Sequence, residues 1–247
     1  MRQLNVTTAM GKRLIGKAMA EHPEIEAVLE KGTLVIIAGT TNGYVAEEIL
    51  NSIGQADGFT RSGFRRGVTV APGAKAPQAD FPGDVVIVDG KWQKGKTILD
   101  VADDLKEGDI VLKGANAFDP RGQPAVQIGD IQGGTVLAAT RAVVGRRVRL
   151  IVPVGLEKRV FEDVNVLAQL CCEPGAKGPR LFPMLGEIFT ELDAIELLTG
   201  AVPTLIAAGG VCGAEGACWL GVDGDDDEIQ AAVDLVKSVS GEPACEP

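Results

Sequence analysis

Residues 33–50 decide the fold of this protein, and they read TLVIIAGTTNGYVAEEIL. The first six, 33–38, form a continuous apolar run with β-branched residues, which is typical of a strand buried on both faces. The glycine-bounded turn GTTNG follows at once at 39–43. A helix is predicted next, because its apolar residues fall on one stripe and its glutamates on another. A strand, a glycine turn and a helix in this order predict an α/β fold.

Similar apolar runs recur outward from this unit, at 84–89, 109–113 and 149–154. Helices are predicted at 8–21, 98–105, 135–144 and 160–170, and a short helical turn at 24–29. The Gly-, Arg- and Pro-rich segment 55–78 is interpreted as an excursion, with a short strand at 67–70. Together these elements predict an open, mainly parallel sheet that is flanked by helices.

The last third of the chain differs in character. A Gly/Pro-rich linker is predicted at 173–183. A helix at 193–199, strands at 204–207 and 217–222 and a helix at 228–239 follow it. We therefore predict a main α/β ligand-binding domain (1–172), a small α+β C-terminal appendage packed on it as a satellite unit (184–240), and a mobile tail (241–247).

Composition limits the classes of function. The chain has 247 residues, of which 45% are hydrophobic and 23% charged, so it can bury a core. Its formal net charge of −10 argues against a nucleic-acid partner, because phosphate backbones are repelled. No segment reaches the length of a membrane span, no signal peptide is recognised, and five cysteines do not make a disulfide scaffold. We expect a cytoplasmic protein with reduced thiols and no membrane partner.

The first candidate site is the turn that follows the strand at 33–38. Free backbone N–H groups and the helix dipole attract anions at such a turn, and glycine lets a phosphate or carboxylate approach closely. The alternative is a plain capped turn, since Thr and Asn are ordinary N-caps. The turn lacks the Walker and dinucleotide-binding motifs. The predicted ligand-binding residues here are Gly39, Thr40, Thr41, Asn42 and Gly43.

A second candidate cluster follows the strand at 109–113. Lys113 could hold an anion, and Asp119 could act as an acid or base, so these two are the predicted catalytic residues. The alternative for Asp119 is a type I turn with Pro120 to Gly122, and the sequence leaves both interpretations open. Further predicted ligand-binding residues of this cleft are Gly114, Asn116, Gly129, Gly133 and Gly134.

Four segments, 39–43, 114–119, 129–135 and 152–158, together resemble motifs of the ribose-5-phosphate isomerase / CoA-transferase superfamily. This superfamily includes methylthioribose-phosphate isomerases, proteins like initiation factor 2B and effector domains of sugar-responsive repressors. The resemblance covers about residues 30–160 and implies the superfamily's fold, with an anion-binding edge. The appendage is similar to the small extra domain of the isomerase.

The chain also departs from the isomerase. Where the isomerase reads Asp-Gly-Ala-Asp-Glu, residues 113–117 read KGANA, so three acidic groups are missing. Residues 128–131 read IGDI in place of Lys-Gly-Gly-Gly. For the nucleophile of a CoA-transferase, Glu157 and Glu215 are the residues to consider. The resemblance therefore implies a fold and an anion-binding edge without a defined reaction.

No metal site is predicted. The spacing of Cys171, Cys172, Cys212 and Cys218 does not match that of structural zinc sites. His22, the only histidine, is interpreted as a cap at a helix end. The glycine-rich segment 209–216 is interpreted as a tight hairpin turn.

The predicted function is binding of a small anionic metabolite, phosphorylated or carboxylated, with no cofactor. The protein could be an isomerase-like or transferase-like enzyme, with Asp119 or Asp130 as acid/base. Alternatively, it could be a metabolite sensor, or a structural or oligomerising protein. Homo-oligomer formation and catalysis are left open.

Overall fold

A computed structural model describes residues 1–66, 69, 70, 73, 75, 81 and 83–244 of the chain. Half of the strand predicted at 67–70 and the last three residues of the predicted mobile tail lie outside the described residues. The thiol of Cys245 lies outside them as well.

The centre of the protein is a six-stranded sheet of order β10-β8-β5-β2-β3-β4. Four of the six strands, β10, β8, β5 and β2, run parallel to one another. Strands β3 and β4 run antiparallel to their neighbours. The strands are β2 (Thr33–Ile36), β3 (Val85–Val88), β4 (Lys91–Trp92), β5 (Ile110–Leu112), β8 (Arg149–Pro153) and β10 (Glu187–Phe189). The predicted α/β class is confirmed, and the sheet is mixed, with three parallel and two antiparallel strand pairings.

The antiparallel pairing of β3 with β4 has a local cause. Asp89 and Gly90 join β3 to β4, and both have positive φ, at 46° and 70°. A two-residue turn of this kind matches the twist of an antiparallel hairpin. The turn therefore explains the antiparallel pairing of β3 with β4, whereas α3 (Thr40–Ser52) and residues 53–84 connect β2 to β3.

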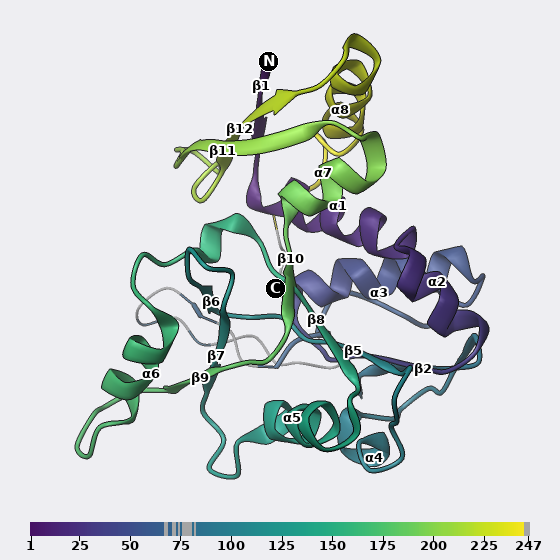
Figure 1. The fold of residues 1–247 in the computed structure, drawn as a ribbon, viewed down its shortest axis with the longest axis vertical. Coiled ribbons are helices and arrows are strands. Elements are labelled where there is room, and N and C mark those ends of the chain that lie inside the picture. Colours follow the sequence, from purple (N-terminus) through teal and green to yellow (C-terminus); the bar gives the residue numbers. More distant parts are fainter. Residues whose placement is uncertain (67–68, 71–72, 74, 76–80, 82, 245–247) are drawn as a thin grey trace.

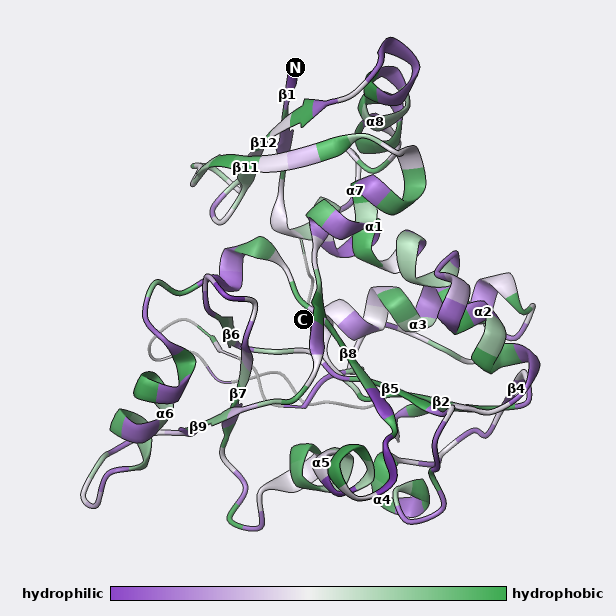
Figure 2. Ribbon diagram, in the orientation of Figure 1, coloured by the Kyte–Doolittle hydropathy of each residue, from purple (hydrophilic) through white to green (hydrophobic). Residues whose placement is uncertain are grey.

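Helices cover both faces of the sheet (Figure 1). One face carries α1 (Thr8–Ala20), α2 (Pro23–Glu30) and α3 (Thr40–Ser52), and the other carries α4 (Ile98–Val101) and α5 (Gly134–Arg146). The central strands are among the most hydrophobic segments in Figure 2, as expected for strands buried on both faces. Helices α1 and α3 approach closely, because a Cβ on Gly16 would lie 2.9 Å from the carbonyl oxygen of Tyr44.

A second, antiparallel sheet has the order β6-β7-β9 and lies beside the central one (Figure 1). Its strands are β6 (Ala117–Phe118), β7 (Pro124–Ile128) and β9 (Arg180–Pro183), and α6 (Val164–Cys172) packs against it. Strand β9 belongs to the segment that the sequence suggested as a linker. Proline and glycine in that segment therefore do not exclude a strand at its end.

The third sheet contains the predicted satellite elements and one strand from the N-terminus. Helix α7 (Glu191–Thr199), strands β11 (Val202–Ala208) and β12 (Cys218–Asp223) and helix α8 (Asp226–Ser238) follow in the predicted order. Strand β1 (Arg2–Val6) adds to β12 in an antiparallel pairing. The satellite sheet thus joins the two ends of the chain, whereas β10, which precedes α7, pairs with β8 in the central sheet.

No helix in the described part of the chain combines the length and the apolar character needed to cross a lipid bilayer.

A buried amide ties two central strands together. The Nδ2 group of Asn42 donates to the carbonyl oxygens of Ile37, at 2.8 Å, and Leu112, at 3.0 Å, just beyond β2 and at the end of β5. The side chain is 0% exposed. Its loss would leave two buried carbonyl groups each short of a hydrogen bond.

We expect Asn42→Ala to lower the free energy of unfolding by about 2–3 kcal/mol in urea titrations, because buried carbonyls lose their donor. Asn51→Ala is the control, since Asn51 lies exposed on the same helix. The control should change stability by less than about 0.5 kcal/mol. Equal changes in the free energy of unfolding for the two substitutions would contradict a stabilising role for the Asn42 hydrogen bonds.

Candidate functional site

The carboxyl ends of β2, β5 and β8 meet at one edge of the central sheet, because these strands are parallel. Strand β3 runs the other way, so its first residues arrive at the same edge. Asp84, directly before β3, is 0% exposed there. Its carboxylate accepts hydrogen bonds from the backbone N–H groups of Ala38, at 2.9 Å, and Ile98, at 2.8 Å. Arg66 forms an ion pair with the same carboxylate, with its Nη2 atom 2.8 Å from Oδ1 of Asp84.

Two lysines without a partner stand at this edge. Lys113 directly follows β5, and Lys158 ends the short 3-10 helix η1 (Leu156–Lys158) beyond β8. Both are half-buried, and neither ammonium group makes a hydrogen bond or ion pair with another described residue. Because the sheet brings their strands together, the two ammonium groups share one surface.

The surroundings lower the pKa of both lysines. Burial lowers the pKa of Lys113 to about 8; the charge of Asp84 opposes this, while the charges of Arg66 and Lys158 add to it. Burial also lowers the pKa of Lys158, against the charge of Glu157 and with that of Lys12. The site thus concentrates positive charge that no described residue neutralises through an ion pair with either lysine.

A pair of carboxyl groups adjoins this cluster where β10 ends. Glu191, the first residue of α7, is 3% exposed and accepts a hydrogen bond from the N–H of Leu156 at 2.9 Å. Burial raises the pKa of Glu191 to about 8, and the charge of Glu157 raises it further. Burial and these two carboxyl groups also raise the pKa of the Cys218 thiol to about 12. Cys218 is therefore a protonated, unreactive thiol at neutral pH.

The five residues of the predicted turn at 39–43 differ in their exposure to solvent. Gly39 and Thr40 are half-buried, whereas the other three residues are buried. Asn42 is occupied by the strand tie, and Gly43 lies against Arg61 and Phe64. The Oγ1 atom of Thr41 and the Oδ1 atom of Asn42 are buried without a partner. Only Gly39 and Thr40 are therefore left to contact a ligand beside Lys113 and Gly114.

Asp119 lies in the turn that joins β6 to β7. Its carboxylate is buried and accepts from the N–H groups of Arg121 and Gln123, at 2.9 and 3.1 Å, and of Val164 at 3.4 Å. Burial would raise its pKa, but these bonds and the charge of Arg121 lower it. Gly122 N–H donates to the Asp119 carbonyl at 2.9 Å, closing a β-turn. Asp119 thus has the geometry expected if its role is to form a turn. A catalytic role for Asp119 stays a prediction.

The remaining predicted residues are dispersed. Asn116 is exposed, and its Oδ1 accepts from the N–H of Gln127 at 2.9 Å. Gly129 and Gly133 lie in the loop between β7 and α5, and Gly134 is the first residue of α5; Figure 1 places this segment apart from the N-terminus of α3. The structure brings together Gly39, Thr40, Lys113 and Gly114 and does not add the loop glycines to them.

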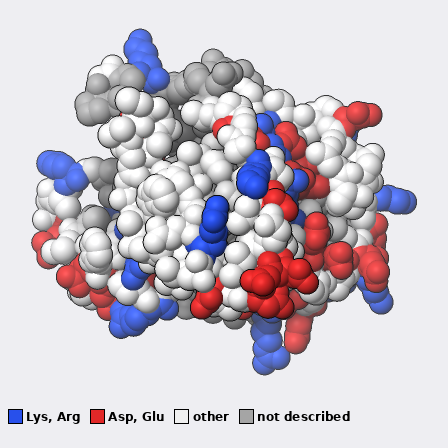
Figure 3. Space-filling model, turned by 90° about the horizontal axis from the view of Figure 1, so that it is seen from above, with Lys and Arg blue, Asp and Glu red and all other residues white. Residues whose placement is uncertain are grey.

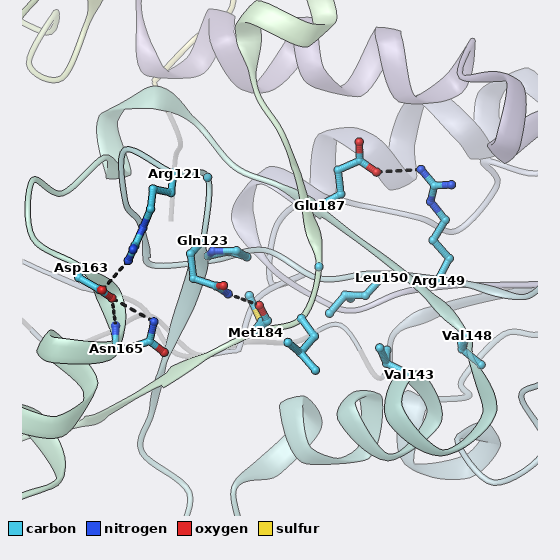
Figure 4. Close-up of a pocket in the computed structure, with 14 residues that line it drawn as sticks. Arg121, Gln123, Val143, Val148, Arg149, Leu150, Asp163, Asn165, Met184 and Glu187 are labelled. Carbon is cyan, nitrogen blue, oxygen red and sulfur yellow. Dashed lines mark hydrogen bonds and ion pairs between the residues drawn. The ribbon is translucent and has the colours of Figure 1, made fainter.

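A cavity of about 790 Å³ lies elsewhere, between the sheet of β7 and the amino ends of β8 and β10 (Figure 4). Its floor includes Val143, Val148 and Leu150, while Arg149 and Arg121 turn their guanidinium groups toward acidic partners. Because both cations are already paired, this cavity offers no free charge to an anion.

Sequence reasoning missed Asp84, Arg66 and Glu191 and gave Lys158 no role. Lys158 and Glu157 directly follow a predicted strand, the position that drew attention to Lys113, and were available by the same argument. Arg66 lies in the excursion, so no local pattern placed it at the sheet edge. The burial of Glu191 depends on α1 packing over it, since a Cβ on Gly11 would lie 2.2 Å from its Oε1.

The cysteines and the histidine make no metal centre. No group of three or more His, Cys, Asp or Glu side chains stands in position to hold a metal ion within the described ranges. His22 accepts a hydrogen bond from the N–H of Glu24 at 3.3 Å and caps α2 at its N-terminus.

The surface charge is uneven. On the face drawn in Figure 3, acidic side chains gather along one side, mixed with Lys and Arg, and leave a wide uncharged area. The net charge of −10 thus coexists with a local cluster of cations at the strand ends.

Comparison with protein-family models, with curated proteins and with solved structures finds no match for this chain.

We expect the raised pKa of Glu191 to make stability fall as pH rises from about 4.5 to about 8. In this range the folded chain keeps a proton that the unfolded chain releases, so deprotonation favours unfolding. Glu191→Gln imitates the protonated carboxyl and should remove this part of the fall, as measured by urea unfolding at pH 5–9.

The exposed Glu196 on the same helix provides the matched control, as Glu196→Gln. Parallel pH profiles for the wild type and Glu191→Gln would contradict the buried, protonated carboxyl.

Proposed function

We propose that this protein binds a small anionic metabolite, with a phosphate or carboxylate group, at the carboxyl edge of its parallel strands. The observation that carries the proposal is the pair Lys113 and Lys158, half-buried and without an ion-pair partner among the described residues. Burying an ammonium group without a partner is unfavourable, and two such groups also repel each other. An anion between them offsets both effects.

The backbone nearby supports the same ligand. Gly39 precedes α3 and presents no side chain, so the first N–H groups of a 13-residue helix point toward this edge. Such groups favour negative charge, and the helix dipole adds to the attraction. Thr40 contributes a hydroxyl group at the same place. The ligand would therefore meet charge from the lysines and neutral donors from the helix.

The finer classification of the fold belongs to the same proposal. The motif resemblance to the ribose-5-phosphate isomerase / CoA-transferase superfamily agrees with an anion at the ends of parallel strands. It also agrees with a small α+β unit that follows the main sheet. The mixed central sheet and the added β1 are this chain's own features, and they supply no reaction.

Two functions remain candidates within this proposal. An enzyme would use groups at the sheet edge, where Lys113, Glu157 and Glu191 are the titratable side chains nearest to the proposed ligand. A metabolite sensor would use the same anion site alone. The titratable groups with shifted pKa favour the enzyme, since such shifts concentrate at active sites.

Binding can be tested with inorganic phosphate and a set of sugar phosphates and carboxylates. We expect at least one of them to raise the melting temperature, and Lys158→Gln to weaken its affinity about tenfold or more, because a charge-assisted contact is lost. Isothermal titration calorimetry measures the affinity. Lys237→Gln, at a side chain that is 70% exposed on α8, should leave binding unchanged. Binding that is unaffected by Lys158→Gln would refute the site, as would the absence of any binding.

A further inference from the structure

The Lys113 side chain lies among groups that disfavour its charged form. It is half-buried at the end of β5, and Arg66 and Lys158 bring two positive charges close enough to act on it. Such surroundings produce a lysine that is partly a free amine at neutral pH.

Among the described residues, Asp84 is the acidic group that favours the charged form of Lys113, and its carboxylate already accepts other hydrogen bonds. Oδ1 of Asp84 accepts from the N–H of Ala38 and from Arg66, and Oδ2 accepts from the N–H of Ile98. The hydrogen bonds of the Asp84 carboxylate are therefore with the backbone and Arg66. It forms no ion pair with Lys113.

Resting on the anion site proposed above, we infer that Lys113 is a nucleophilic amine that forms an imine with an aldehyde or ketone group of the bound metabolite. The ligand class is thus narrowed to a small carbonyl compound that carries a phosphate or carboxylate. The anionic group would lie against Lys158 and the N-terminus of α3, and the carbonyl carbon would lie at Lys113.

The reaction balances without any co-reactant. The lone pair of neutral Nζ attacks the carbonyl carbon, and one of the two Nζ protons passes through solvent to the carbonyl oxygen to give a neutral carbinolamine. The C–O bond then breaks, and the hydroxyl group leaves with a second proton as water. The protonated imine that remains draws electrons from the adjacent carbon, and hydrolysis returns the amine and the carbonyl compound.

Lys158 differs from Lys113 in the charges that face it. Burial and the charge of Lys12 lower the pKa of Lys158, and the carboxyl groups of Glu157 and Glu191 oppose this lowering. They favour the ammonium form, which suits the binding of an anion. The two lysines would therefore divide the work, with Lys158 holding charge and Lys113 reacting.

The test uses pyridoxal phosphate, a phosphorylated aldehyde, as a probe and borohydride to trap the imine on the intact protein. Peptide mass spectrometry then locates the label. We expect Lys113 to be modified first, at a rate that rises with pH through about 8. Lys113→Arg should lower total labelling at limiting probe about tenfold while keeping the charge, and Lys237→Arg should not change it. Inorganic phosphate should suppress the label, and pyridoxal without phosphate should react more slowly.

The outcomes separate the two proposals. If phosphate stabilises the protein but the label spreads over exposed lysines and omits Lys113, the imine is overturned and the anion site stands. If Lys113 is labelled and phosphate neither binds nor competes, the reactive amine stands and the proposed function fails. If neither occurs, both proposals fail. Circular dichroism and melting of Lys113→Arg establish that this variant is folded.

Discussion

The buried carboxylate of Asp84 organises the edge of the sheet on which this account depends. It holds the N–H groups that follow β2 and begin α4, and it carries Arg66 at the same time. A carboxylate that is 0% exposed is retained only if its hydrogen bonds replace water. Through these bonds one side chain fixes the end of β2, the start of β3 and the start of α4. It also places a guanidinium group beside Lys113.

The charges around this edge form two neighbouring groups with opposite tendencies. Lys113, Lys158 and Arg66 accumulate positive charge, and burial lowers the pKa of both lysines. Glu157 and Glu191 place two carboxyl groups beside these cations, and burial raises the pKa of Glu191. A site with an amine of lowered pKa and a carboxyl of raised pKa can both accept and donate protons near neutral pH. The carboxyl pair lies where the satellite unit, through Cys218 and α7, meets the central sheet.

The strength of the local signal determined what could be predicted from sequence. The run at 33–38 and its helix are long and strongly periodic, so class and element order followed from them. Strand β1 has only two apolar residues, Leu4 and Val6, and it exists because β12 pairs with it. The pairing of β3 with β4 depends on the Asp89-Gly90 turn, a signal of only two residues.

The site followed the same rule. Gly39, Thr40, Lys113 and Gly114 come together because each directly follows a parallel strand, and that position is readable from sequence. The loop of Gly129 follows β7, which belongs to a different sheet, so the same argument did not apply to it. Arg66, Asp84 and Glu191 reach the site through long-range packing. No local sequence pattern predicts that these three residues lie close together.

The most direct measurement is a crystal structure of the protein soaked with tungstate, an electron-dense tetrahedral anion that imitates phosphate. We expect anomalous density between Lys113, Lys158 and the N–H groups at Thr40. An edge that is filled by the chain's own side chains, or tungstate found only beside other cations, would contradict this expectation.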